Sequence, residues 1–171
     1  MKAAVLYLLS ATGFFFSVFC RGGEPSSAAS EETVFHRQVR KAMPETDSFH
    51  RKGKAVWEIL DRSGSRLGTL YLETVDDSQR TMGFGGPIEI AIVVNGKDEI
   101  SGILVGKNQE TPRFLKRVAA AGFLKKWNGM TLKKAAETDM DTVSGATYTS
   151  AAIASGVKKL AASLIGEDTG K

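Results

Sequence analysis

The sequence predicts an α+β fold, in which helices pack on one antiparallel sheet. Two observations lead to this prediction. Four short segments rich in β-branched and aromatic residues follow one another between residues 55 and 105 and are separated by turn residues. Helical patterns precede and follow this block. A separate apolar segment near the N-terminus predicts a membrane or signal helix ahead of the domain.

The composition restricts the chemistry that the chain can support. Its net charge of +4 is spread among 23 basic and 19 acidic residues, so nucleic acid is not an expected partner. The one cysteine, Cys20, ends the apolar segment. Disulfides, thiolate-bound zinc and Cys-ligated iron–sulfur clusters are therefore excluded within this chain. Two histidines, His36 and His50, make no convincing metal site, so a redox role needs an organic cofactor.

We expect four regions: a signal or membrane anchor at 1–20, a linker at 21–30, the domain at 31–166 and a tail at 167–171. Lys2 precedes 17 uncharged residues, and a Gly- and Ser-rich stretch follows, which disfavours a helix buried in the domain. Three outcomes stay open, namely a retained anchor with Lys2 inside, cleavage after Ala28, and lipidation of Cys20. We favour the anchor, and each outcome places residues 31–171 outside the cytoplasm.

The first half of the domain is predicted as a helix and two strands. Ser30 is the expected N-cap of a helix that runs to about Met43, where Pro44 stops it. Phe35 and Val39 belong to its apolar stripe, whereas both histidines are expected in solvent. Strands at 55–60 and 67–74 flank a turn at 61–65, with Trp57 in the core.

A Gly-rich elbow at 82–87 leads to a second predicted hairpin, with strands at 88–94 and 99–105. Asn95-Gly96 lies between them, and both of these residues tolerate positive φ. All four strands are expected in one sheet.

Helices dominate the last third of the chain. Thr111 and Pro112 form an expected N-cap and first helical residue, and Gly122 ends that helix. Short segments at 123–129, with Trp127 in the core, and 131–136 follow. A final helix is expected from 149 to 165, with Gly166 as its stop. Its apolar stripe consists of Ile153, Val157, Leu160 and Leu164.

The run before this last helix is the candidate site. Its small and hydroxyl-bearing residues are Ser144, Gly145, Ala146, Thr147, Tyr148, Thr149 and Ser150. Small residues let the backbone approach a ligand, and a helix N-terminus suits a phosphate. The Thr147 hydroxyl could form an ester with that phosphate, and the Tyr148 ring could stack on an aromatic ligand or pack in the protein. These physical arguments permit a phosphate site, but a simple helix cap explains the same residues.

The run Asp141-Thr-Val-Ser-Gly-Ala-Thr147 resembles the flavinylation motif of the FMN-binding domain family. That family includes the G subunit of Rnf-type electron transport complexes and the C subunit of sodium-translocating NADH:quinone reductases. Two further matches lie upstream in the family's order: residues 83–88, which include Gly85 and Gly86, and Glu110-Thr111-Pro112. The resemblance covers about residues 33–165.

The resemblance implies an FMN that is covalently attached to Thr147 through a phosphoester. The other expected cofactor-binding residues are Ser144, Gly145, Ala146, Tyr148, Thr149, Ser150, Glu110, Thr111, Gly85, Gly86 and Asp141. Thr147 has no evident base nearby in the sequence, so the resemblance implies an external flavin transferase that uses FAD and magnesium. Asp141 is then either recognised by that enzyme or a cap for local N–H groups.

The sequence departs from the family pattern directly after Glu110-Thr111-Pro112. The family commonly continues with Gly-Leu-Gly, whereas here Arg113, Phe114 and Leu115 follow. A His often lies two residues before the Glu of that motif, and Asn108 takes this position here. We therefore expect the surroundings of the flavin to differ from those in the large complexes.

The expected function is an extracytoplasmic electron relay within a membrane-associated redox chain. Its expected partners are membrane redox proteins, and the chain would be a redox subunit rather than a stand-alone enzyme. Two alternatives stay open: the flavin module of an extracytoplasmic reductase that acts on a small acceptor, and a membrane-anchored binding module without a cofactor.

Overall fold

The computed structural model describes residues 33–73 and 80–168. The expected leader and linker lie outside these residues. Among the helices within them, none has both the length and the apolar character that a membrane span requires. The elements in chain order are α1 (Val34–Ala42), β1 (Ser48–Arg51), β2 (Val56–Leu60), β3 (Arg66–Leu72), β4 (Ile88–Asn95), β5 (Ile100–Asn108), α2 (Pro112–Ala120), the 3-10 helix η2 (Phe123–Trp127), α3 (Leu132–Glu137) and α4 (Thr147–Asp168).

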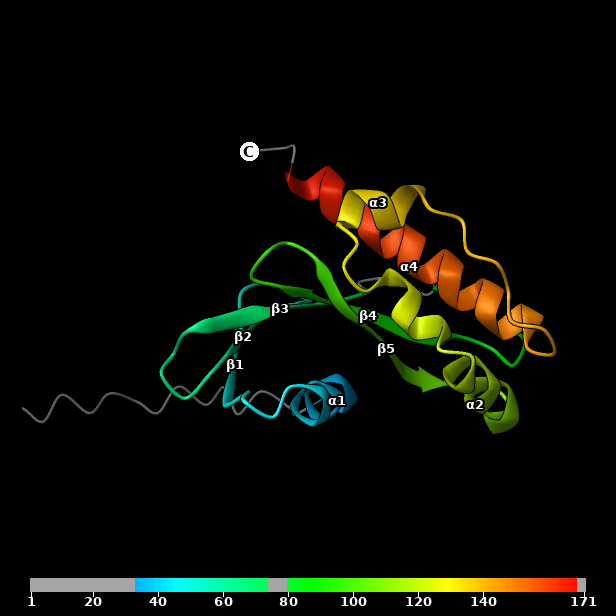
Figure 1. Cartoon of the computed structure of the whole chain (residues 1–171), viewed down its shortest axis with the longest axis horizontal. Helices are drawn as coiled ribbons and strands as arrows, with labels where there is room; N and C mark the ends of the chain where they lie inside the picture. Colours follow the sequence, from blue (N-terminus) through cyan, green and yellow to red (C-terminus); the bar gives the residue numbers. More distant parts are fainter. Residues whose placement is uncertain (1–32, 74–79, 169–171) are drawn as a thin grey trace, which may run out of the picture. The chain divides into compact units, whose positions relative to one another are not determined.

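The sheet has the predicted antiparallel form, and its five strands are ordered as they occur in the chain, β1 to β5. Helix α1 covers one face, α4 and η2 cover the other, and α3 packs against α4 (Figure 1). The α+β prediction is therefore confirmed. Strand β1 was not predicted, because its residues Ser-Phe-His-Arg contain only one apolar side chain.

Strand β4 is the centre of the core because both of its faces are covered. Ile90 and Ile92 point into the cluster with α4, whereas Ala91 and Val93 point into the cluster with α1. Alternate side chains of a strand face opposite sides, so a strand between two helical layers is apolar throughout. Ile153 and Val157 of the predicted α4 stripe are fully buried against this sheet face.

Helix α1 begins later than predicted. Its N-cap is Thr33, not Ser30, and the Thr33 hydroxyl accepts a hydrogen bond from the His36 backbone N–H while the Thr33 N–H donates to His36 Nδ1. This reciprocal cap draws His36 inward, where its ring lies 4.3 Å from the ring of Phe49 and 5.5 Å from that of Trp57. His36 is only 2% exposed, so the expectation that it lies in solvent is wrong.

The turn between β4 and β5 also differs from the prediction. The residue with positive φ is Asp98 (φ 59°), whereas Gly96 is not among the residues with positive φ. The Asn95 side-chain oxygen accepts hydrogen bonds from the N–H groups of Lys97 and Glu99. This side chain stabilises the connection between the two strands, in which Asp98 and not Gly96 takes the left-handed conformation.

Helix α4 extends beyond both predicted ends. It begins at Thr147 rather than 149, and it continues past Gly166 to Asp168. A glycine near a helix end lowers helix propensity but does not force termination. The earlier start matters for the site, because Thr147 becomes the first residue of the helix.

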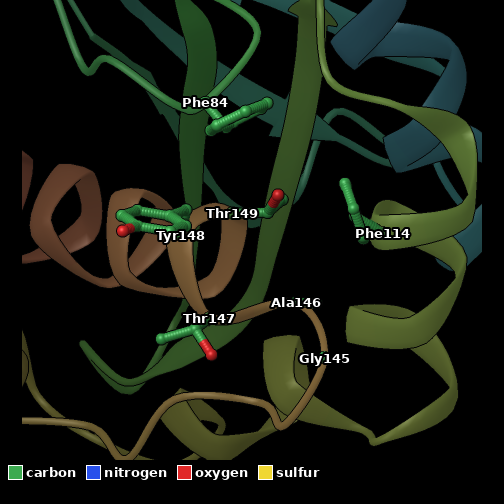
Figure 2. Close-up of a pocket in the computed structure, with 7 residues that line it drawn as sticks. All are labelled: Phe84, Phe114, Gly145, Ala146, Thr147, Tyr148 and Thr149. Atoms are coloured by element: carbon green, nitrogen blue, oxygen red, sulfur yellow. The ribbon is translucent and has the colours of Figure 1, made fainter.

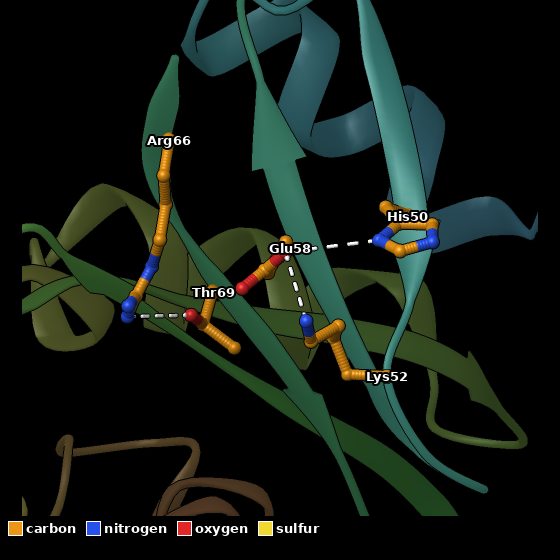
Figure 3. Close-up of polar contacts among 5 residues, drawn as sticks. All are labelled: His50, Lys52, Glu58, Arg66 and Thr69. Atoms are coloured by element: carbon orange, nitrogen blue, oxygen red, sulfur yellow. Dashed lines mark hydrogen bonds and ion pairs between the residues drawn. The ribbon is translucent and has the colours of Figure 1, made fainter. Parts of the chain in front are cut away.

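Part of the sheet face opposite α1 is polar instead of apolar. Figure 3 shows Glu58 on β2 with His50 Nδ1 at 3.7 Å and Lys52 Nζ at 3.5 Å, and Arg66 donating to Thr69 Oγ1 at 2.9 Å. His50 is exposed, as predicted. The ion pairs of Glu58 are partly exposed and contribute little to stability, whereas Thr69 is buried.

Candidate functional site

The loop before α4 sets the position of the candidate residues. The Ala146 N–H donates to the Val143 carbonyl at 2.9 Å, and Gly145 adopts φ 73°, which glycine accepts readily. The hydroxyl of buried Ser150 accepts from the Val143 N–H and donates to the Ala146 carbonyl, both at 2.9 Å. Ser150 thus fixes the loop from within the helix.

A cavity of about 330 Å³ lies at the start of α4. This volume is at the lower end of the range for small-molecule sites, roughly 300–1,000 Å³. Figure 2 shows its lining residues, which come from the elbow before β4, from α2, from the loop before α4 and from the first turn of α4. They are Phe84, Phe114, Gly145, Ala146, Thr147, Tyr148 and Thr149.

Two aromatic rings at this cavity are unusually exposed. Phe84 and Tyr148 are 71% and 74% exposed, and their ring centroids lie 5.9 Å apart at an interplanar angle of 40°. Large aromatic side chains usually gain stability by burial. An exposed tilted pair beside a cavity is suited to pack against a flat aromatic ligand.

Glu110 connects the elbow to α4. Its side chain is buried, and Oε1 accepts a hydrogen bond from the Gly85 N–H at 2.7 Å while Oε2 accepts from the Thr149 hydroxyl. A Cβ on Gly85 would collide with the Gln109 carbonyl, so the elbow approaches this segment at a distance that only glycine allows. The carboxylate therefore holds Phe84 and α4 in one arrangement.

The hydroxyls of the candidate run differ in their surroundings. Thr149 and Ser150 are buried, and their hydroxyls are engaged by Glu110 and by the loop carbonyls. Thr147 is exposed and lines the cavity, and among the described residues its hydroxyl has no hydrogen-bond partner. Two threonines line the cavity, and of these Thr147 has an exposed hydroxyl whereas that of Thr149 is buried.

The remaining predicted residues lie around the cavity without lining it. Ser144, Asp141 and Thr111 are exposed, and Thr111 occupies the predicted N-cap position of α2 without a side-chain cap bond. Gly86, with φ 141°, lies beside the Gln109 side chain.

Phe84 and Phe114 were not among the predicted site residues. Phe84 was part of a motif taken for its glycines, and Phe114 was noted as a departure from the family pattern that changes the surroundings of the flavin. The signal that could have identified Phe84 is a large aromatic residue among glycines, where no apolar periodicity requires one.

The family comparison agrees with this geometry. Residues 83–162 match the model of the FMN-binding domain family, and this segment contains the elbow, Glu110 and Thr147. No curated protein matches the chain. The match thus identifies an FMN-binding domain at residues 83–162, which is the family that the sequence resembles.

Proposed function

We propose that the chain is an extracytoplasmic electron-transfer flavoprotein with FMN covalently attached to Thr147. One observation carries the attachment site: the Thr147 hydroxyl is exposed at the first residue of α4 and lines the cavity beside Phe84 and Tyr148. A phosphate at this place would meet the helix N-terminus, which favours negative charge.

The residues at the cavity fit an FMN. Phe84, Tyr148 and Phe114 offer apolar contacts to the flavin rings, and Thr147 offers the oxygen for the phosphoester. When bound, the flavin would supply the electron-transfer chemistry that the side chains of this chain lack. The protein's own contribution would be to hold the ring and to fix its surroundings through the Glu110 hydrogen bonds.

Attachment would need a separate flavin transferase. The buried carboxylate of Glu110 contacts residues 144–150, but it accepts a hydrogen bond from the Thr149 hydroxyl and not from that of Thr147. A threonine hydroxyl without a base is a weak nucleophile. The transferase would join Thr147 Oγ to the FMN phosphorus of FAD, with release of AMP and loss of the hydroxyl proton. The exposure of Thr147 supports access by such an enzyme.

The proposed location follows from the apolar run near the N-terminus, which would anchor the chain with the domain on the extracytoplasmic side. Covalent attachment suits that side, because a free cofactor would be lost by dilution. The exposed rings of Phe84 and Tyr148 leave the cavity edge open to a membrane redox partner. Donor and acceptor would then be other proteins, with this chain as the relay between them.

The test is the intact mass of the chain after co-expression with a flavin transferase. The wild-type chain is expected to gain the mass of FMN less one water, and Thr147→Ala is expected to gain nothing. Thr142→Ala is the matched control, since Thr142 is an exposed threonine of the same loop outside the cavity. Flavin retained by Thr147→Ala after denaturation would contradict the assignment.

A further inference from the structure

A second cavity, of about 250 Å³, lies next to the first. It is lined by Arg113, Phe114, Arg117 and Gly145, and Phe114 and Gly145 line the first cavity too. The two cavities therefore share a wall, but their chemistry differs. Aromatic rings dominate the first, whereas two guanidinium groups dominate the second.

Arg113 and Arg117 lie four residues apart on α2, so they share one face of that helix. The Arg113 guanidinium lies over the Phe114 ring, 4.8 Å from its centroid. Arg117 lies against the loop before α4, because a Cβ on Gly145 would collide with its Nη1. Arg117 thus lies against the segment that leads to Thr147, and Arg113 lines the same cavity.

Within residues 33–73 and 80–168, no carboxylate pairs with either arginine. The first N–H groups of α4 have no intrahelical acceptor and add partial positive charge nearby. An anion in the second cavity would therefore meet uncompensated positive charge from two directions. Guanidinium groups match the oxygens of a phosphate particularly well, because they donate two parallel hydrogen bonds.

We propose that Arg113 and Arg117 form a subsite for the phosphate of the flavin nucleotide. This inference rests on the proposed function, and it assigns the two ends of one ligand to two adjoining cavities: the flavin rings to Phe84 and Tyr148, the phosphate to the arginines. Of the two arginines, Arg113 lies in the segment that departs from the family's Gly-Leu-Gly. It would hold the phosphate beside Thr147 before attachment and would neutralise the phosphodiester afterwards.

The test compares reversible binding of FMN and riboflavin, which differ only in the phosphate. The full chain with Thr147→Ala cannot attach either compound, so fluorescence titration measures binding alone. We expect FMN to bind at least tenfold more tightly than riboflavin. The preference should weaken with R113Q or R117Q alone and disappear when both are added. It should persist with K116Q, which removes one positive charge from α2 outside the cavity and so matches each single variant.

Inorganic phosphate provides a second readout at constant ionic strength. It should displace FMN from the Thr147→Ala chain and leave riboflavin binding unchanged. In the loaded wild-type chain, the ³¹P resonance of the phosphodiester should shift when Arg117 is replaced by Gln and not when Lys116 is. Both arginines are exposed, so thermal unfolding should show that the variants remain folded.

Equal affinities for FMN and riboflavin, or a preference that survives loss of both arginines, would overturn the subsite. The mass test for Thr147 is independent of this result. A chain that gains FMN but shows no phosphate preference would refute the subsite alone. A chain that prefers FMN but gains no mass would refute covalent attachment alone.

Discussion

At the residue scale, Glu110 determines more of the site than any side chain that lines it. Its two carboxylate oxygens accept hydrogen bonds from different segments, the Gly85 N–H in the elbow and the Thr149 hydroxyl in α4. Thr149 is 1% exposed, so water cannot replace the carboxylate there without rearrangement. A buried donor that loses its acceptor keeps the full desolvation penalty.

Glu110→Ala is therefore expected to lower the free energy of unfolding by roughly 2–4 kcal/mol. Glu110→Gln should cost less, since the amide keeps one acceptor oxygen. Chemical denaturation at neutral pH measures both variants. Glu137→Ala is the control: Glu137 is exposed on α3, and its loss should change stability by about 0.5 kcal/mol or less. A Glu110→Ala chain as stable as Glu137→Ala would contradict this role.

The sequence indicated the small residues of the loop before α4, but it did not indicate the environment of the aromatic ring of Phe84 or of the imidazole ring of His36. Gly145, Ala146 and Thr147 could be chosen because their run resembles the flavinylation motif of the family, whereas their size alone also fits a simple helix cap. The exposed position of Phe84 and the buried position of His36 could not be predicted. Whether an aromatic ring is exposed or a histidine buried depends on neighbours from distant segments, and local patterns do not contain that information.

At the scale of elements, the packing of α4 on the sheet depends on Gly156. A Cβ at this position would lie 2.6 Å from Thr81 Oγ1 and 2.9 Å from Ile90 Cγ1. Helix and sheet are therefore closer here than any other residue would allow. This contact sets the distance between α4 and the sheet. Because Thr147 is the first residue of α4, the contact also affects the position of Thr147 at the cavity.

Gly156→Ala tests this seating. Alanine improves helix propensity by up to ~1 kcal/mol, but overpacking costs about 1–3 kcal/mol, so we expect a net destabilisation of ~1 kcal/mol. Gly166→Ala on the same helix should instead stabilise by up to ~1 kcal/mol, because a Cβ there meets nothing within 4 Å. Thermal or chemical unfolding of the two variants gives the comparison. If both variants were more stable than the wild-type chain, α4 would be able to move away from the sheet without loss of stability, which would contradict the role of Gly156.

Elements with strong periodicity were predictable, and those defined by pairing were not. The four predicted strands follow from runs of β-branched and aromatic residues between turn residues, and α2 follows from Thr111-Pro112. Strand β1 forms by pairing with the free edge of β2, because its own residues have little preference for a strand. The start of α4 at Thr147 likewise depends on the buried hydroxyl of Ser150, a tertiary contact.

At the scale of the whole molecule, the global stability of the domain should respond to one half-buried carboxyl. Burial raises the pKa of Glu73 above its ordinary value of 4.5, and the hydrogen bond that Thr81 donates at 2.8 Å and the charge of Lys159 oppose that rise. A raised pKa means that the folded chain binds this proton more tightly than the unfolded chain does. Ionisation of Glu73 therefore reduces stability as the pH rises from about 4.5 through the raised pKa.

Glu73→Gln removes that charge and keeps an acceptor for the Thr81 hydroxyl. The variant is expected to be more stable than the wild-type chain at pH 7, with the difference disappearing near pH 4, where Glu73 is protonated in both states. Urea denaturation midpoints at the two pH values measure this. Asp139→Asn should behave oppositely, because Lys158 lowers the pKa of Asp139, so its contribution is present above pH 3.8 and is lost as the pH falls. If Glu73→Gln were less stable than the wild-type chain at pH 7, the Thr81 hydrogen bond and Lys159 would outweigh the cost of burying the charge.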